Sequence, residues 1–254
     1  MRILQKIWFV LLLGTISSVY GEDCSEKQFK NCFRDADACR VLAEQGHACA
    51  QLNLGFIYKR GSSYFSLAQD YEKSFKWYSK AAEQGDITSQ YNVANMYLNG
   101  QGVIQDYKEA ERRYRLIADR ASEKNLGREK WNFTWNTVHA QNTLGWMYSE
   151  GKGVIQDYKE AVKWFSLAAE RGYYTAQNNL GMMYENGEGV LPTYAIAHMY
   201  YNIAATSGYE DAIENRKRIS KKMQLSQIEE AQDLAREWVR GHDNNLPDFN
   251  AITW

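Results

Sequence analysis

One short segment of the sequence matches a catalytic motif. Ser149-Glu150-Gly151-Lys152 has the Ser-x-x-Lys spacing of serine penicillin-binding enzymes, in which the serine is the nucleophile. The Ser-Asp-Asn and Lys-Thr-Gly motifs that complete such a site do not follow it. The segment also falls at the end of an expected helix and in the next turn, whereas the enzyme motif opens a helix. A weak penicillin-binding or β-lactamase-like hydrolase is therefore only the alternative function, and we assign no catalytic residue.

The other reactive side chains lack the spacing of a metal or cofactor site. No Cys-x-x-Cys pair occurs, and the paired glycines recur at expected helix ends instead of forming one phosphate-binding loop. We therefore expect no metal, no cofactor and no enzymatic activity. The four histidines share no metal-ligand spacing; they are His47, His139, His198 and His242.

Residues 1–21 have the pattern of a secretory signal peptide. Arg2 and Lys6 give the positive start, and the apolar run over 7–13 is shorter than the roughly 20 residues of a membrane span. Loss of these two cations changes the formal net charge from −1 to −3 (−1 − 2 = −3), and no basic block occurs, so nucleic acid is a poor partner. We expect cleavage, no membrane span afterwards, and a periplasmic or secreted protein.

All the cysteines lie just behind this leader. An even, clustered set in an exported protein indicates two disulfides, and three connectivities are possible, so the pairing stays open. A metal site is the weaker alternative, because only one histidine lies nearby. The cysteines are Cys24, Cys32, Cys39 and Cys49.

An internal repeat organises the rest of the chain. The nonamer Gly-Val-Ile-Gln-Asp-Tyr-Lys-Glu-Ala occurs identically at 102–110 and 153–161. A Gly-x-Gly pair follows Tyr97, Tyr148 and Tyr184, and the last two tyrosines are 36 residues apart (184 − 148 = 36). Such a period predicts stacked units of two helices each.

The pattern within one unit predicts both helices and their packing. Ala140, Leu144 and Tyr148 recur every four residues and form the buried stripe of the first helix. Gly145 removes a side chain where the second helix must approach closely. Asp157 is expected to cap the second helix, with Glu160 as its capping-box partner. The aromatic and alanine residues of the second helix form the core: Ala161, Trp164, Phe165, Ala168 and Ala169.

The repeats set the domain organisation that we expect. A cysteine-containing N-terminal cap precedes the repeats, an insert that contains Trp131, Phe133 and Trp135 interrupts them, and capping helices and a flexible tail follow. The insert's aromatic residues either pack back onto the repeats or offer a contact surface. The expected ranges are 22–46 for the cap, 47–86, 87–121, 137–172 and 173–209 for four repeats within 47–209, 122–136 for the insert, 210–241 for the capping helices and 242–254 for the tail.

These units resemble Sel1-like repeats, relatives of the tetratricopeptide repeat. The resemblance rests on Ala-Gln-x-Asn-Leu-Gly-x-x-Tyr, Gly-x-Gly-Val, Asp-Tyr-x-x-Ala-x-x-Trp and Ala-Ala-x-x-Gly, with Ala94 and Arg113 as departures. It implies an all-α, right-handed superhelix (solenoid) of antiparallel helix pairs, common in bacterial exported proteins that act as adaptors or on host cells. Cysteine-rich members of this family are linked to penicillin binding, which is the basis of the hydrolase alternative.

A solenoid of this kind offers its first helices as a concave binding groove. We expect a scaffold that binds a protein or peptide there, envelope-related or host-directed, with a structural envelope protein as a further alternative. Asparagines can bond an extended peptide backbone, or they can satisfy groups between helices. Phe56, Trp146 and Met182 are expected apolar anchors. The predicted partner-binding residues are Asn53, Phe56, Asn92, Asn95, Trp146, Asn179 and Met182, on a face that also holds Arg60, Asn99, Thr143, Glu150 and Asn186.

Overall fold

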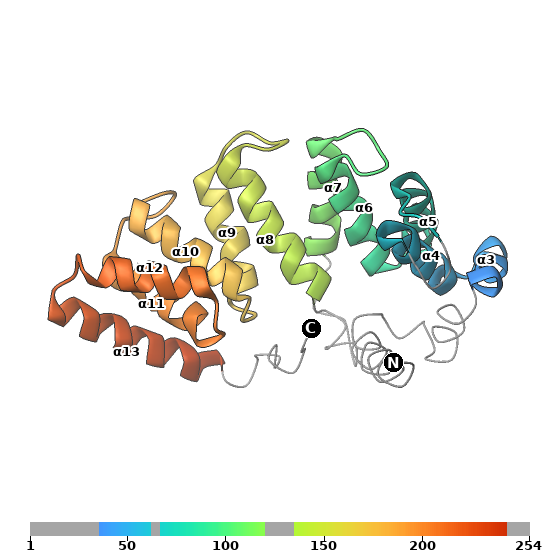
Figure 1. Ribbon diagram of the computed structural model, residues 1–254. Coiled ribbons are helices and arrows are strands. Elements are labelled where there is room, and N and C mark those ends of the chain that lie inside the picture. Colours follow the sequence, from blue (N-terminus) through green and yellow to red (C-terminus); the bar gives the residue numbers. More distant parts are fainter. Residues whose placement is uncertain (1–35, 62–66, 120–134, 243–254) are drawn as a thin grey trace, which may run out of the picture. The chain divides into compact units, whose positions relative to one another are not determined.

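The computed structural model describes residues 36–61, 67–119 and 135–242, and every regular element in these residues is an α-helix (Figure 1). The helices belong to two compact units that divide between Thr137 and Val138. The predictions of a signal peptide, of pairing by Cys24 and Cys32, and of a flexible tail fall on residues outside this description and remain predictions.

The first unit contains an N-terminal helix and two helix pairs. The helix is α3 (Ala36–Glu44), and the pairs are α4 (Ala48–Arg60) with α5 (Tyr71–Glu83) and α6 (Ile87–Asn99) with α7 (Tyr107–Asp119). Helix α8 (Trp135–Glu150) begins in this unit and continues in the second. The second unit adds α9 (Tyr158–Ala169), α10 (Tyr174–Asn186), α11 (Tyr194–Thr206), α12 (Glu210–Ser220) and α13 (Leu225–His242).

In each repeat the two helices run antiparallel, as Figure 1 shows. We call α4, α6, α8 and α10 the first helices, and α5, α7, α9 and α11 the second helices. The predicted all-α fold of consecutive helix pairs is confirmed.

The Gly-x-Gly turn ends the first helix and also packs against the preceding repeat. Gly100 caps α6 in the left-handed region (φ 65°) and donates its N–H to the carbonyl of Met96. The second glycine, Gly102, has φ 69°, and a Cβ there would lie 2.1 Å from the carbonyl oxygen of Tyr71 at the start of α5. The second glycine is therefore required by close contact with another backbone as well as by the turn.

The aspartate that precedes a second helix caps it as predicted. One side-chain oxygen of Asp157 accepts from the backbone N–H of Lys159 (2.9 Å) and of Glu160 (3.1 Å). The predicted capping box is wrong, however. The Asp157 N–H donates to the carbonyl of Tyr148 across the turn (3.0 Å), so it does not need the glutamate, and Glu160 instead pairs with Lys163 at 2.7 Å.

Small residues on the first helix and aromatic residues on the second form the core of each pair. In the third repeat Gly145 lies against Phe165, and a Cβ on the glycine would come within 2.6 Å of the ring. All five residues predicted to face inward from α9 are buried; they are Ala161, Trp164, Phe165, Ala168 and Ala169. The prediction of the core from its period is therefore confirmed.

Additional helices cover the repeats at the N-terminal end of the first unit and the C-terminal end of the second. Helix α3 packs Cys39 and Ala43 against the first repeat, and neither Cys39 nor Cys49 is a free thiol. The last helix begins at Leu225, with the Gln227 side chain accepting from the backbone N–H of Gln224 (2.9 Å). Ser226, whose Ser-x-x-Glu spacing to Glu229 is typical of a capping box, is therefore the second residue of this helix and not its cap.

The insert contributes its last aromatic residue to a helix. Trp135 is the first residue of α8, so the helix starts inside the range predicted for the insert. Its ring packs edge-on against Tyr91 of α6, with ring centroids 6.4 Å apart. For this residue the structure favours packing onto the repeats; Trp131 and Phe133 lie outside the described residues.

Candidate functional site

The predicted partner-binding residues all lie on first helices and form one group in each compact unit. Helices α4 and α6 carry Asn53, Phe56, Asn92 and Asn95, and helices α8 and α10 carry Trp146, Asn179 and Met182. The two groups differ in how much side chain they leave exposed.

In the first repeat the predicted residues are engaged within the chain. Asn53 is fully buried, and its Nδ2 lies 3.7 Å from the Sγ of Cys49. Phe56 is half-buried, and the guanidinium of Arg60 lies over its ring at 4.9 Å. A partner could reach Phe56 and Arg60, but not Asn53 in this arrangement.

In the second repeat the asparagines bond to neighbouring helices. Asn92 accepts from the ammonium of Lys59 on α4 at 3.0 Å and donates to the carbonyl of Thr88 at 2.9 Å. Asn95 accepts from the hydroxyl of Tyr114 on α7 at 2.8 Å. Of the two roles considered for these side chains, the contacts favour satisfaction between helices, although the partners on the other helices are side chains instead of backbone groups.

In the second unit an asparagine pair links two successive first helices. The Nδ2 of Asn179 on α10 donates to the Oδ1 of Asn142 on α8 at 3.2 Å. This leaves the Nδ2 of Asn142 and the Oδ1 of Asn179 without a hydrogen bond inside the described part of the chain. One donor and one acceptor therefore remain available side by side.

Two large apolar side chains follow this pair on the same helices. Trp146 lies four residues beyond Asn142, and Met182 lies three residues beyond Asn179, so each shares a helix face with its asparagine. Trp146 is 38 % exposed and Met182 is 43 % exposed. We call Asn142, Trp146, Asn179 and Met182 the inner strip.

Asn142 was not among the predicted residues, because the 36-residue period aligns Asn179 with Thr143 instead. Contacts between successive repeats or helices also join residues 33 apart, as in Lys59 with Asn92, or residues 37 apart, as in Asn142 with Asn179 and Asn178 with Asn215. The offset of 37 also joins Glu185 to Lys222 at 3.3 Å. These offsets depend on how neighbouring helices lie against each other, which the repeat period alone does not specify.

The serine of the Ser-x-x-Lys match and two of the four histidines form hydrogen-bond contacts within the chain. The hydroxyl of Ser149 donates to the backbone carbonyl of Trp146 at 2.9 Å. Burial lowers the pKa of His139 to about 4, and the Tyr173 hydroxyl lies 3.2 Å from its Nδ1. His198 lies 3.1 Å from the Ser220 hydroxyl, and burial and then the charge of Arg216 lower its pKa.

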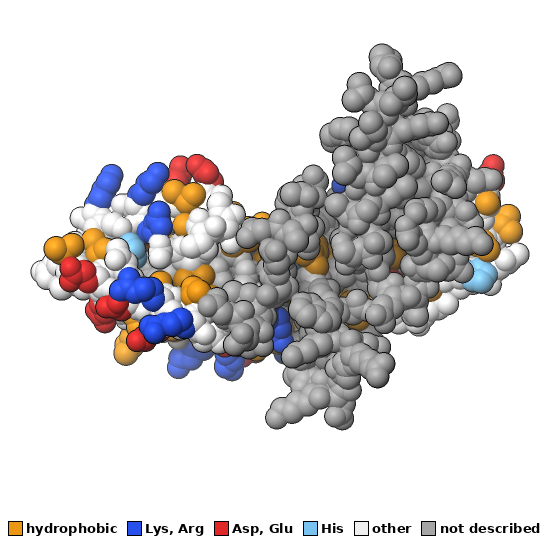
Figure 2. All heavy atoms as spheres, turned by 90° about the horizontal axis from the view of Figure 1, so that it is seen from below, with side chains coloured by type: hydrophobic (Ala, Val, Ile, Leu, Met, Phe, Trp, Pro, Cys, Tyr) orange, Lys and Arg blue, Asp and Glu red, His pale blue; other side chains and the backbone are white. Residues whose placement is uncertain are grey.

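Neither a metal cluster nor a membrane-spanning helix occurs among the residues that the structure describes. No three histidine, cysteine, aspartate or glutamate side chains in these residues come together as metal ligands. The helices described there are too short or too polar to cross a bilayer. Figure 2 shows acidic and basic side chains interspersed over the C-terminal helices, on the described part of the face in view.

The repeats identify the family. The sequence model of the Sel1 repeat matches residues 50–86, 87–121, 138–173 and 175–209, more than half of the chain. The chain belongs to the Sel1 repeat family. A solved Sel1 repeat protein from Oxalobacter formigenes is 30 % identical, with a TM-score of 0.56 over 78 % of this chain and 71 % of that chain.

Curated relatives of this Sel1 repeat protein are much longer. Protein sel-1 homolog 2 of rat is 33 % identical over 131 residues, which are 51 % of this chain and 17 % of the relative. Chitin synthase regulatory factor 3 of Schizosaccharomyces pombe is 30 % identical over 141 residues, which are 55 % of this chain and 13 % of the relative. The chain thus spans less than a fifth of either relative. Sel1 repeat proteins generally mediate protein–protein interaction.

Proposed function

We propose that this Sel1 repeat protein is an exported scaffold that binds a protein or peptide segment along the inner strip. The observation that carries the proposal is the exposure of Trp146 and Met182 on successive first helices, directly beyond the Asn142–Asn179 pair. Large apolar side chains on a face that also offers hydrogen-bonding groups are typical of binding hot spots.

The polar half of the strip favours an extended peptide. A peptide group presents one N–H and one C=O, and the strip offers one acceptor, the Oδ1 of Asn179, and one donor, the Nδ2 of Asn142. The neighbouring Thr143 hydroxyl is already used, because it donates to the carbonyl of His139 at 2.9 Å. An extended segment could therefore bond to the asparagine pair while its side chains contact Trp146 and Met182.

The family also supports a binding role. Sel1 repeat proteins act through protein contacts, and the S. pombe relative is named a regulatory factor, which fits a protein that works through a partner. The export part of the proposal rests on the leader pattern of residues 1–21. N-terminal sequencing of the mature protein tests it: we expect a new start close to residue 22, and a start at Met1 would contradict export by cleavage.

Capture of a partner by the immobilised chain tests the binding part. Extracts and culture medium of the source cell supply candidates, which are identified by mass spectrometry. Trp146→Ala with Met182→Ala should lose a partner that the wild type retains, because removal of an anchor residue typically costs about 1–3 kcal/mol. Leu167→Ala is the control, since Leu167 is equally exposed (37 %) but lies on α9, a second helix.

The outcomes are distinct. If the double variant captures the same partner as strongly as the wild type, with an unchanged helical circular dichroism spectrum, the inner strip is not the binding face. If Leu167→Ala loses the partner instead, contact runs along the second helices.

A further inference from the structure

One position on the second helices packs an aromatic side chain against the first helix of the same repeat. In the first repeat Trp77 lies in one cluster with Tyr58. In the fourth repeat Tyr200 stacks on Tyr184, with ring centroids 5.8 Å apart. In the second repeat the same position holds Arg113, whose guanidinium lies over Tyr97 at 5.1 Å.

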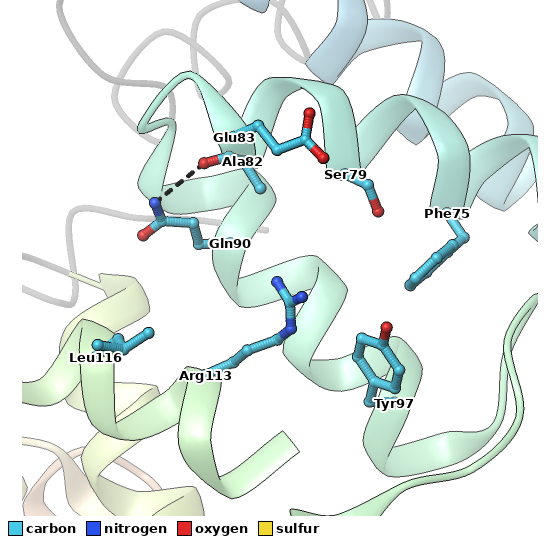
Figure 3. A pocket seen from close by; sticks show the side chains of 8 residues that line it. All are labelled: Phe75, Ser79, Ala82, Glu83, Gln90, Tyr97, Arg113 and Leu116. Atoms are coloured by element: carbon cyan, nitrogen blue, oxygen red, sulfur yellow. Dashed lines mark hydrogen bonds between the residues drawn. The ribbon is translucent and has the colours of Figure 1, made fainter. Parts of the chain in front are cut away.

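A cavity lies where the arginine replaces the aromatic side chain. It has a volume of about 450 Å³, within the range of about 300–1,000 Å³ that is usual for ligand sites. Its walls are α5 and α7, and α6 forms its floor (Figure 3). The lining residues are Phe75, Ser79, Ala82, Glu83, Gln90, Tyr97, Arg113 and Leu116.

The two ends of the cavity differ in chemistry. One end is aromatic, since Phe75 packs edge-on against Tyr97 with ring centroids 5.4 Å apart. The other end holds Glu83 and Gln90, and Gln90 donates to the carbonyl of Ala82 at 3.2 Å. Phe75 and Glu83 are eight residues apart on α5, about 12 Å at 1.5 Å per residue. This length fits about three residues of extended chain at about 3.4 Å each.

Arg113 enters the cavity with part of its guanidinium uncommitted. Its Nε bonds to Glu109 Oε1 at 2.6 Å, while both terminal nitrogens lack a hydrogen-bond partner in the described residues. Arg112 bonds to the same glutamate through two nitrogens, at 2.8 and 2.7 Å. Two cations therefore share one carboxylate, whose pKa they hold at about 2, chiefly through the Arg112 hydrogen bond. The cluster keeps one net positive charge at neutral pH.

We propose that this cavity is a second binding site, for an acidic peptide segment of a partner protein. A carboxylate of the segment accepts two hydrogen bonds from the terminal nitrogens of Arg113, a geometry that the guanidinium fork matches. An apolar side chain next to that carboxylate packs between Phe75 and Tyr97. Glu83 repels a second acidic residue at the opposite end, which fixes the direction of the segment.

The site uses none of the residues of the inner strip, so it goes beyond the proposed function and can be tested separately. The probes are two peptides, acetyl-Gly-Phe-Asp-Leu-Gly-amide and its counterpart with Asn in place of Asp. Binding to the full chain is followed by NMR chemical-shift changes. We expect saturable shifts confined to α5, α6 and α7 with the Asp peptide, and an affinity at least about ten-fold lower for the Asn peptide.

Four variants locate the interaction. Arg113→Trp restores the aromatic side chain of the other repeats, so it should fold, fill the cavity and abolish binding. Arg113→Met keeps the apolar stem, so it should bind both peptides equally and weakly. Lys108→Gln removes one positive charge from an exposed residue of α7 that does not line the cavity, and it should bind the Asp peptide within about three-fold of the wild type. Trp146→Ala with Met182→Ala should bind it unchanged.

Several results would overturn the proposal. Equal affinity of the wild type for the two peptides would show that Arg113 does not bind the carboxylate of the Asp peptide. Undiminished binding by Arg113→Trp would show that the peptide does not bind in the cavity. The absence of shifts in α5, α6 and α7 at 5 mM peptide, about the weakest range that such contacts provide, would remove the site altogether.

Discussion

The ring of Phe165 lies directly over the backbone of Gly145, where a Cβ would come within 2.6 Å of it. The same contact joins Gly55 to Tyr78 and Gly181 to Tyr201, each at 2.5 Å. Close approach of the two helices in these repeats therefore depends on the missing side chain.

Gly145→Ala should destabilise the protein even though alanine favours helices. The added methyl group must displace a ring that is almost fully buried, and overpacking of this kind costs about 1–3 kcal/mol. The free energy of unfolding in urea measures the effect. The second repeat already carries alanine at the corresponding position, so Ala94→Gly is the control and should cost about 1–2 kcal/mol, from helix propensity and from the burial of one methyl group. An unchanged or higher stability of Gly145→Ala would contradict close packing at this site.

The Asn142–Asn179 hydrogen bond should couple α8 to α10. Alanine at either position should lower the free energy of unfolding by about 1 kcal/mol. The double variant should lose less than the sum of the two single variants, which corresponds to a coupling energy of about 0.5–1.5 kcal/mol. A double-mutant cycle of urea unfolding measures this value. Strict additivity would mean that the two amides do not interact in solution.

Protonation of His139 should weaken the fold in mild acid. Burial holds its pKa at about 4 in the folded protein, below the ordinary value of 6.5. Between these two values the unfolded chain binds more protons, so stability falls as the pH falls from 6.5 to 4, by at most about 1.4 kcal/mol for each pH unit. His139→Asn should flatten this part of the urea-unfolding profile relative to the wild type. A wild-type imidazole that titrates near 6.5 by NMR would contradict the burial.

An ionic cluster around Glu185 links the fourth repeat to α12. Arg218 of α12 bonds to this carboxylate through two nitrogens, and the Tyr201 hydroxyl donates to it at 2.9 Å. The hydrogen bond from Arg218 is the main cause that lowers the Glu185 pKa below 4.5. The stabilisation is therefore complete above about pH 4.5 and is lost as the pH falls through the lowered pKa.

Glu185→Gln should consequently destabilise the protein by about 1–3 kcal/mol at pH 7, the value of hydrogen bonds to charged groups. The difference from the wild type in urea unfolding should shrink toward pH 3. Glu237→Gln, an exposed change on α13, should stay within about 0.5 kcal/mol at both pH values. If the wild type and Glu185→Gln differ in the free energy of unfolding by the same amount at pH 7 and at pH 3, the charge of Glu185 does not contribute to stability.

Much of the fold follows from local patterns. The apolar stripe of Ala140 and Leu144, the glycine at 145 and the cap at Asp157 each depend on residues within one helix pair, so the sequence predicts them. Glu160 could not be assigned in this way, because its role depends on whether the Asp157 N–H already has an acceptor. That acceptor, Tyr148, lies across the turn.

The candidate sites depend on contacts between repeats, which the period does not specify. Asn92 and Asn179 occupy the same position of their repeats. The Oδ1 of Asn92 accepts a hydrogen bond from Lys59, whereas the Oδ1 of Asn179 has no hydrogen bond within the described residues. Arg113 is visible in the sequence as a departure from the motif. Its consequence depends on Phe75 and Glu83 of the preceding repeat, which line the same cavity.

Site-specific photocrosslinking in the source cell tests the binding role of the inner strip most directly. A photoreactive phenylalanine analogue is placed at Met182 on the strip, or at Leu167 on α9 as the matched exposed control, and crosslinked proteins are identified by mass spectrometry. We predict a discrete crosslinked partner from position 182 that is lost when Trp146→Ala is added, and none from position 167. The same product from both positions, or none from position 182, would contradict partner binding along the first helices.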